Sequence, residues 1–219
     1  MSVNETATLN LNDFYTVLRE RHSVRAYDPD VKISKEELGE MLELATSAPS
    51  SSNLQPWRFL VIDDQKLKEE LYPIANNQQQ VLDASAVIAV LGDLKSFEQA
   101  ENIYSSTVKA GFMDEATKTA FVERLNKGYG GMGPEKLHQV NLLDAGLVSM
   151  QFMLVAKAKG YDTVPMGGFN PDKFSEAYNL PDTLKPLLLI AVGKAAKPAR
   201  STVRLPLEQI TYWNKVEKK

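Results

Sequence analysis

Two arginines, a serine and a histidine lie within five residues of one another, in the run Arg21-His22-Ser23-Val24-Arg25. An arginine side chain offers a planar fork of donors that matches a phosphate group, and a serine hydroxyl adds another donor. The cluster could therefore bind a phosphate. The other interpretation is structural, because basic residues at a helix C-terminus complement the helix dipole. Taken alone, the cluster favours the structural interpretation.

A second candidate for a binding site is the polar stretch Ala48-Pro49-Ser50-Ser51-Ser52-Asn53-Leu54-Gln55-Pro56. Its prolines and small polar residues disfavour both a helix and a central strand, so the stretch is expected to be a loop. Strong helix and strand signals lie on either side of it. A polar loop held between two regular elements is a common place for binding residues.

A glycine-rich run at 128–133 matches the pattern G-x-G-x-x-G, which binds dinucleotides in one particular setting. That setting needs a strand before the run and an acidic residue about 20 positions after it. Here residues 121–127 indicate a helix, and the region after the run is an apolar helix. The run is therefore interpreted as a flexible connection between two helices.

The composition excludes several kinds of site. The chain has 219 residues, and residues 1–219 are expected to form a single domain. It has no cysteine, which excludes thiolate chemistry, disulfides and cysteine-built metal sites. The two histidines, His22 and His138, are too few and too scattered for a histidine zinc site. No metal is therefore expected.

Charge and hydropathy point away from nucleic acid and membranes. The net charge is −3, the sequence pI is about 5.5, and the basic residues form no block. The first ten residues are polar and include Glu5, which is unlike a signal peptide. With the lack of cysteine, these features predict a cytoplasmic protein.

Periodicity and capping residues predict the elements that must position the candidates. Helices are expected at 11–21, with Asn12 or Asp13 as N-cap, and at 34–47, where Ser34 and Glu37 form a capping box. Short apolar runs that are rich in β-branched and aromatic residues predict strands. The other expected elements are strands at 57–62, 86–91 and 184–192, a helix after Asp63 or Asp64, charged helical stretches within 93–127, and a long helix from Pro134 to Gly160.

The long helix is apolar on most sides and would extend about 39 Å. Asp144 and Gln151 interrupt it, so a membrane span is not expected. A helix that is apolar all round needs cover on all sides. In so small a chain a second subunit is expected to cover part of it, with Leu147 and Met150 as candidate contacts.

The chemical candidates occur in an order that resembles the nitroreductase family of flavoenzymes. The order is Arg-His-Ser-x-Arg at 21–25, then Ala-Pro-Ser-Ser-Ser-Asn-x-Gln-Pro-Trp at 48–57. Further landmarks are Leu82-Asp83-Ala84-Ser85, Val164-Pro165-Met166-Gly167-Gly168-Phe169 and Arg204-Leu205-Pro206. The landmarks cover nearly the whole chain.

This resemblance implies an α+β fold with a mostly antiparallel central sheet flanked by helices. It also implies an intertwined homodimer with two FMN sites at the subunit interface. By the resemblance, Arg21, Ser23 and Arg204 hold the FMN phosphate, with His22 inside the same motif, and Arg25 lies near N1 and O2 of the ring. The remaining implied FMN contacts are Pro49, Ser50, Ser51 and Asn53 from the other subunit, Asn77 at the polar edge of the ring, Gln80, and Pro165, Met166, Gly167 and Gly168 against the ring.

The chemistry that the resemblance implies belongs to the flavin, so no catalytic side chain is expected. NADH or NADPH would reduce FMN and leave, and a nitroaromatic or quinone would then take two electrons in the same space. Three positions depart from the family pattern: Gln80 and Thr202 replace common lysines, and Gly167 replaces a common glutamate. Arg200 could restore the missing charge.

Two alternatives stay open. One is a related flavoenzyme with another reaction, such as enone reduction, dehalogenation or flavin breakdown. The other is a protein that binds flavin without turnover. The segment from Phe97 to Met132 is expected to form a mobile lid that shapes acceptor choice, because its aromatics Phe112 and Phe121 could stack on a flat substrate.

Overall fold

An antiparallel sheet forms the centre of the molecule. In the computed structural model, which describes residues 13–216, four strands lie in the order β1-β2-β4-β3. The continuous apolar run that begins at Ala86 becomes the central strand β2 and is almost entirely buried. The strands are β1 (Trp57–Ile62), β2 (Ala86–Asp93), β3 (Asp162–Met166) and β4 (Leu184–Gly193). The expectation of an α+β fold with an antiparallel sheet is confirmed.

Strand β3 was not expected from the sequence. It pairs with β4 at the edge of the sheet, where Pro165 opposes Ile190. Proline lacks the N–H that a central strand must donate, but an edge strand can hold it with that side facing away from its partner. Pro165 therefore weakens the strand pattern in the sequence, and the position of β3 at the sheet edge accommodates this proline.

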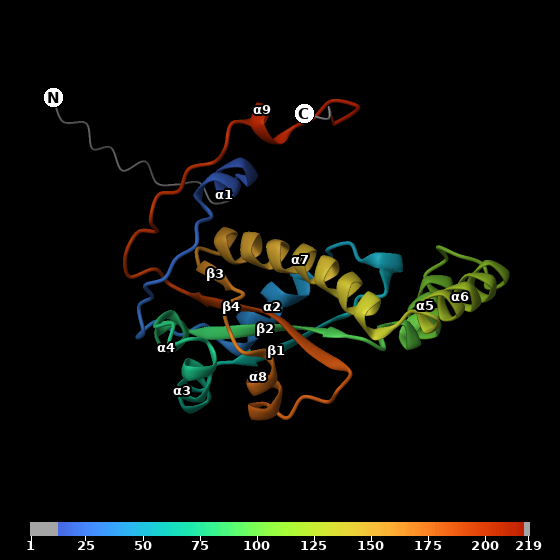
Figure 1. Cartoon of the computed structure of the whole chain (residues 1–219), viewed down its shortest axis with the longest axis horizontal. Helices are drawn as coiled ribbons and strands as arrows, with labels where there is room; N and C mark the ends of the chain where they lie inside the picture. Colours follow the sequence, from blue (N-terminus) through green and yellow to red (C-terminus); the bar gives the residue numbers. More distant parts are fainter. Residues whose placement is uncertain (1–12, 217–219) are drawn as a thin grey trace.

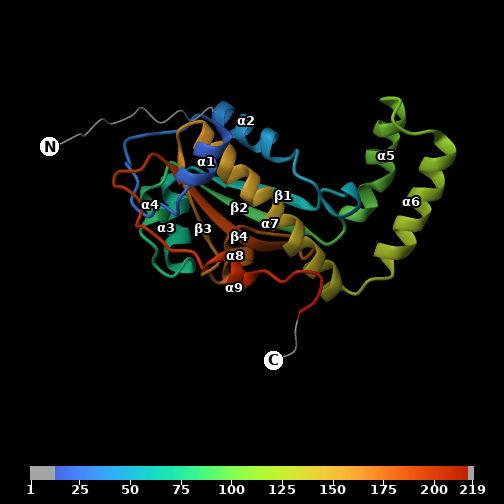
Figure 2. The same ribbon diagram turned by 90° about the horizontal axis from the view of Figure 1, so that it is seen from above.

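Helices cover both faces of the sheet (Figures 1 and 2). On β2, Val87, Ala89 and Leu91 pack toward one side, while Ala86, Ile88 and Val90 pack toward the other. This alternation follows from the two-residue period of a strand. Helices α3 (Gln65–Ile74), α4 (Gln80–Asp83) and α8 (Pro171–Ala177) share the first core cluster, and α2 (Lys35–Ala45) and α7 (Pro134–Ala158) share the second.

The helix starts follow the capping residues of the sequence. Helix α1 (Phe14–Glu20) begins after Asp13, whose carboxylate accepts the N–H of Thr16. Ser34 caps α2 by accepting the N–H of Glu37, and Asp64 caps α3. The expected helix at 11–21 is shorter in the structure, and its first two residues, including the alternative cap Asn12, lie outside the described residues.

Helix α7 buries one face and leaves another face uncovered. Val148, Phe152 and Ala156 are among the residues that pack toward the sheet. Among the described residues, α7 is the one helix long and apolar enough to cross a membrane by composition, and its packing on β1, β2, β3 and β4 makes it a core helix. Its exposed large apolar side chains are Leu142, Leu143, Leu147 and Met150.

A helical hairpin projects from one end of the body (Figure 2). It consists of α5 (Ala100–Lys109) and α6 (Glu115–Gly130), which pack on each other and enclose a small core of their own. The short η2 (Ser96–Gln99) leads into it. Because α6 continues to Gly130, no strand precedes the glycine-rich run, and the setting that dinucleotide binding needs is absent. The interpretation of the run as a helix–helix connection holds only for residues 131–133, since residues 128–130 belong to α6 itself.

The C-terminal segment, residues 201–216, contains the short helix α9 (Leu207–Ile210) and runs past α1 and α7 on the outside of the body (Figure 1). Most of its side chains are exposed. The exposed large apolar residues are Val203, Leu205, Leu207, Ile210, Tyr212, Trp213 and Val216. Such a density of exposed apolar side chains is unusual for a surface that faces only water.

Candidate functional site

The arginine–serine cluster is fixed to the edge strand β3. Arg21 is the C-cap of α1, and its N–H donates to the carbonyl of Val17 over 3.0 Å. Ser23 bridges to Thr163, and the N–H of Val24 donates to the carbonyl of Thr163 over 3.1 Å. The two ends of the cluster therefore belong to a helix terminus and to a sheet edge, which holds its backbone in place.

Ser23 and Arg25 line a cavity of about 340 Å³ with Lys197 and Arg200. Neither Arg25, Lys197 nor Arg200 forms an ion pair with any acidic residue within 13–216. Three cations and a hydroxyl around one cavity create a positive potential that suits an anion. Arg200 was expected near this place, whereas Lys197 stands in no recognisable motif and sequence reasoning missed it.

Arg21 adds an unusual feature to the same region. Its Nε atom is buried and has no hydrogen-bond partner among residues 13–216. Buried guanidinium donors are nearly always paired, so an orphaned one points to a ligand, an ion or water. Together with the cationic cavity, this orphaned donor fits a bound phosphate group.

His22 lines a neighbouring cavity of about 320 Å³ rather than the one that Ser23 and Arg25 line. Glu20, Lys157 and Asp162 contribute to its wall, and Lys157 pairs with Asp162 at 3.0 Å. The structure thus separates His22 from the cationic side of the cluster.

A network of side-chain amides joins the turn after α3 to the end of β3. Asn76 Nδ2 and Gln78 Nε2 both donate to the carbonyl of Gly168, at 2.9 and 3.1 Å. Gln80 Nε2 donates to Gln78 Oε1 at 2.9 Å and contacts the sulfur of Met166 at 3.4 Å. Of the predicted residues, Gln80 therefore meets Met166 and the network holds Gly168. Asn76 and Gln78 are additional members that the motifs did not indicate.

The other predicted residues of this group lie close by. Asn77 is exposed at the turn, where both it and Asn76 have a positive φ. Pro165 is half-buried in β3, and Gly167 and Gly168 are exposed just after it. From Thr163 to Met166 the strand rises about 10 Å. The arginine–serine cluster and the amide network therefore flank the same short strand.

A buried lysine supports helix α4, which carries Gln80. Lys68 is 1% exposed, and its ammonium donates to the carbonyls of Leu82 and Ala84 at 3.1 and 2.6 Å. These are carbonyls at the C-terminal end of α4, where a positive charge is favourable. Burial lowers the pKa of Lys68. The lysine acts as a cap that fixes α4 against α3.

The predicted loop Pro49–Asn53 is held at a different place. It includes the short helix η1 (Ser51–Asn53). Ser51 donates both its N–H and its hydroxyl to Asp144 of α7, at 3.0 Å each. Ser50 Oγ accepts the N–H of Gln55 at 3.0 Å, while Pro49 and Asn53 are exposed.

Within one chain the loop and the arginine–serine cluster do not meet. The loop contacts α7 at Asp144, whereas the cluster lies beside β3, which follows the C-terminal end of α7. Between Asp144 and Ala158 the helix rises about 21 Å. Figure 1 shows the loop region beside the α5–α6 hairpin and the cluster at the other end of the body.

Arg204 also lies apart from the cluster. It is exposed in the C-terminal segment, where its Nη1 donates to Thr202 Oγ1 at 2.9 Å and to the carbonyl of Val203 at 3.0 Å. The structure of one chain thus groups Arg21, Ser23 and Arg25 with Gln80 and Met166–Gly168. It leaves Pro49–Asn53 and Arg204 elsewhere.

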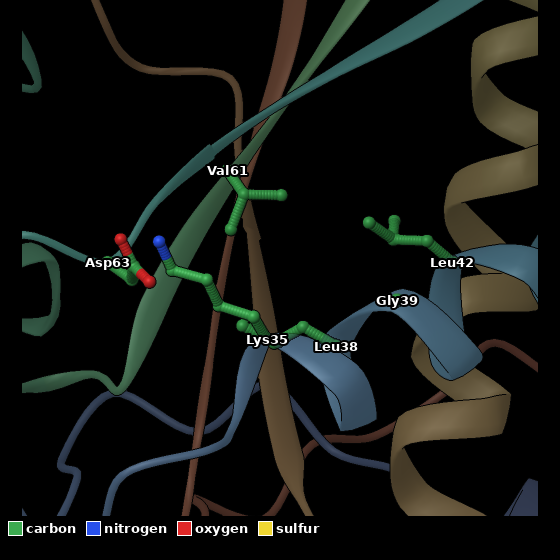
Figure 3. Close-up of a pocket in the computed structure, with 6 residues that line it drawn as sticks. All are labelled: Lys35, Leu38, Gly39, Leu42, Val61 and Asp63. Carbon is green, nitrogen blue, oxygen red and sulfur yellow. The ribbon is translucent and has the colours of Figure 1, made fainter.

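Another cavity, of about 240 Å³, lies between α2 and β1 (Figure 3). Leu38, Leu42 and Val61 make most of its wall apolar, and Lys35 and Asp63 lie together at one end. None of the predicted site residues lines it. Within the part of the chain that the structure describes, no group of three histidine or acidic side chains could hold a metal ion.

Comparison with known proteins identifies the family and agrees with the fold. The profile of the nitroreductase family matches residues 18–194, a range that includes every predicted site residue except Arg204. A Bacillus subtilis protein named "Putative NAD(P)H nitroreductase YdgI" is 44% identical over 94% of this chain and 99% of its own length. The "CLA biosynthesis enone reductase" of Lactiplantibacillus plantarum is 34% identical over 88% of this chain and 90% of its own length. The chain belongs to the nitroreductase family.

Solved structures give the same result. A nitroreductase-type protein from Exiguobacterium sibiricum, solved in complex with FMN, is 46% identical, with a TM-score of 0.89 over 92% of this chain and 97% of that one. A protein from Staphylococcus epidermidis, described as a "putative NAD(P)H:FMN oxidoreductase", is 37% identical, with a TM-score of 0.90 over 92% of this chain and 96% of that one.

Proposed function

We propose that this protein is an FMN-dependent oxidoreductase that passes two electrons from NADH or NADPH to nitroaromatics, quinones or similar small acceptors in a ping-pong cycle. The observation that carries the proposal is the cationic cavity around Ser23 and Arg25, which shares an edge strand with the amide-held segment Met166–Gly168. A relative of 46% identity that binds FMN supports the same cofactor.

The residues present fit FMN at its phosphate end. Arg21 has an orphaned buried donor, and Ser23 and Arg25 line a cavity whose cations have no acidic partner among residues 13–216. In the proposed site Arg21 and Ser23 hold the phosphate, and Arg200 and Lys197 supply further positive charge. Arg204 would reach a phosphate only if the C-terminal segment lies differently in the assembled protein.

When bound, FMN supplies the chemistry, since it can take a hydride from a nicotinamide and pass two electrons to an acceptor. The protein contributes position and charge. Arg25 supplies a fixed positive charge beside the ring. Asn76 and Gln78 hold the carbonyl of Gly168, which fixes the backbone that would face the ring. Asn77 would provide an amide at the ring's polar edge, and Gln80, whose amide contacts Met166, would support the segment that faces the ring.

We further infer that the working form is a homodimer. Leu142, Leu143, Leu147 and Met150 expose an apolar face of α7, and the C-terminal segment exposes seven large apolar side chains. A second copy would cover both surfaces, because burial of apolar area drives association. The dimer also offers a role to the loop Pro49–Asn53, which lies too far from the cluster in its own chain to share a site with it. In the dimer the loop would contact the FMN of the partner.

Enone reduction is a second candidate reaction. A relative of 34% identity over most of both chains is named an enone reductase, and a solved structure of an enone reductase, 32% identical, has a TM-score of 0.84 with this chain. The same site would serve both reactions, because each passes two electrons from the cofactor to a flat, conjugated acceptor. A protein that only binds flavin would instead show no turnover with any acceptor.

The proposal is tested with purified protein. The bound flavin is released and identified, and steady-state rates are measured with NADH and NADPH against a panel of nitroaromatics, quinones and enones. We expect FMN and turnover of at least one acceptor class. Released FAD would contradict the cofactor assignment, and bound FMN without turnover of any acceptor would identify a binding protein. Substantial rates with enones alone would establish the second candidate.

A further inference from the structure

The loop Ser51–Asn53 is tied to the α5–α6 hairpin by two tyrosines. Tyr104 of α5 donates its hydroxyl to the carbonyl of Ser52 over 2.8 Å. Tyr129 of α6 lies 3.2 Å from Ser52 Oγ through its own hydroxyl. One residue of the loop is therefore bonded to both helices of the hairpin, and its neighbour Ser51 is bonded to Asp144 of α7.

The loop needs such support because its backbone is strained. Ser52, Asn53 and Gln55 have φ values of 50°, 49° and 46°, in the left-handed region that residues with a Cβ rarely adopt. Each such residue costs free energy and persists only where surrounding contacts hold it. Tyr104 and Tyr129 hold Ser52 in this way, Asp144 holds its neighbour Ser51, and Ser50 accepts the N–H groups of Asn53 and Gln55.

Tyr104 transmits the position of the hairpin to the loop. Tyr104 is 7% exposed, and its ring packs edge-to-face on Phe121 of α6, with ring centroids 4.8 Å apart. The guanidinium of Arg124 lies over the ring of Phe121, 4.6 Å from its centroid. Burial raises the pKa of the Tyr104 hydroxyl. A shift of α6 relative to α5 would move this ring and disturb its hydrogen bond.

We propose that the hydroxyls of Tyr104 and Tyr129 are positioning groups that clamp the Ser51–Asn53 loop to the α5–α6 hairpin. The inference rests on the proposed function, in which this loop contacts the FMN of the partner subunit. The hairpin, on the acceptor side, and the loop, on the cofactor side, then move as one unit. A change in the hairpin therefore alters the cofactor site although no hairpin residue needs to touch FMN.

Removal of single hydroxyl groups tests the clamp. In Tyr104→Phe and Tyr129→Phe the rings and their packing remain, so the variants should fold. Tyr178→Phe is the matched control, because the Tyr178 hydroxyl also donates to a backbone carbonyl, that of Leu67, over 2.8 Å. One neutral hydrogen bond corresponds to a change of about twofold to tenfold. We expect each hairpin variant to weaken FMN binding by about that factor, and the control to leave it unchanged.

Hydrogen exchange separates positioning from a general loss of stability. In the hairpin variants the amides of residues 48–56 should exchange faster, while the strands β2 and β4 keep the protection of the unaltered protein. A lower melting temperature with unchanged FMN affinity and unchanged exchange in residues 48–56 would overturn the clamp.

Two further variants keep this result distinct from a failure of the proposed function. If Arg21→Ala and Asn53→Ala weaken FMN binding while Tyr104→Phe and Tyr129→Phe do not, the cofactor site stands and the clamp is wrong. If Arg21→Ala weakens binding but Asn53→Ala and both tyrosine variants leave it unchanged, the loop is outside the cofactor site, and the clamp is overturned with it.

Discussion

The carboxylate of Asp144 accepts the N–H and the hydroxyl of Ser51, although the two residues are 93 positions apart in the chain. Asp144 is 1% exposed, in the middle of the core helix α7. A buried carboxylate is costly unless it is well hydrogen-bonded. Ser51 supplies those bonds, so the core helix and the loop stabilise each other.

Replacing Asp144 by alanine should destabilise the protein. The change leaves the Ser51 N–H without its acceptor in a part-buried place, which costs about 1–3 kcal/mol of the free energy of unfolding. Asp144→Asn keeps one acceptor oxygen and should cost less. Urea denaturation of the three proteins at neutral pH measures the difference. Equal stability of the alanine variant and the unaltered protein would contradict the anchoring role.

Asp144 should also make stability depend on pH. Burial raises the pKa of Asp144, and the bonds from Ser51 oppose that rise. The folded protein then keeps this proton at a pH where the unfolded chain has lost it. The contribution is complete below the pKa of an unfolded aspartate and is lost as the pH rises through the folded value. The stability of the unaltered protein relative to Asp144→Asn should therefore fall with rising pH across that window. A rise across the same window would show a lowered pKa.

Arg21 should be important for cofactor affinity. Loss of one charge-assisted hydrogen bond to a phosphate corresponds to about 1.5–3 kcal/mol, so Arg21→Ala should weaken FMN binding by roughly tenfold to a hundredfold. Arg19→Ala is the matched control, because Arg19 is an exposed arginine of the same helix. Titration of the flavin-free proteins with FMN gives both constants. An equal loss of FMN affinity in the two variants would show that only the net positive charge matters and that Arg21 has no specific contact with the phosphate.

Arg25 should influence the reduction potential more than the affinity. A fixed positive charge favours the oxidation state in which the flavin ring is more negative, which is the reduced state. If the differential contribution is about 1.5–3 kcal/mol, its loss should lower the two-electron potential by roughly 30–65 mV. Arg25→Gln removes the charge and Arg25→Lys retains it. Redox titration of both variants beside the unaltered protein tests the role, and an unchanged midpoint in Arg25→Gln would place Arg25 outside the active site.

A charge on the exposed face of α7 should separate the subunits. Leu147 is 41% exposed in the single chain, and Leu147→Glu would bring a carboxylate into an apolar interface. The dissociation constant of the dimer should rise by at least about tenfold, and the FMN content should fall with it. Leu67→Glu is the control, since Leu67 is 40% exposed but lies on α3, across the sheet from α7. A monomer that retains full FMN would contradict the shared site.

The hairpin aromatics should divide into two roles. Phe112 is 83% exposed near the hairpin tip, so Phe112→Ala should leave stability almost unchanged. If its ring stacks on flat acceptors, the KM for nitroaromatics should rise by about twofold to tenfold relative to that for ferricyanide. Phe121 packs on Tyr104, and its replacement should also lower stability. An equal change in KM for every acceptor would show that the hairpin has a structural role and does not select the acceptor.

Local signals in the sequence predicted most of the elements. The strand at 57–62 has its predicted bounds, and Ser34 and Asp64 cap their helices as expected, because caps and strand patterns act over a few residues. Strand β3 was missed because its local signal is weak: it has five residues, contains Pro165 and pairs with β4 alone at the sheet edge.

The site was predictable only in part. The order of motifs indicated Arg21–Arg25, Gln80 and Met166 as separate candidates, and the contact between Gln80 and Met166 appears only in the structure. The bonds of Ser51 to Asp144 and of Ser52 to Tyr104 join residues 93 and 52 positions apart, and no local pattern marks such pairs. Lys197 also lines the cavity, although it belongs to no motif that the sequence shows. Long-range contacts of this kind depend on the completed fold.

The most direct test of the central claim is an anaerobic titration of the purified protein with NADH and with NADPH, followed in the visible flavin absorbance. The account predicts that about one equivalent of at least one nicotinamide bleaches the bound FMN. Addition of a quinone or a nitroaromatic should then restore the oxidised spectrum without any further donor. Bound flavin that neither nicotinamide reduces, or reduced flavin that no acceptor reoxidises, would contradict the proposed function.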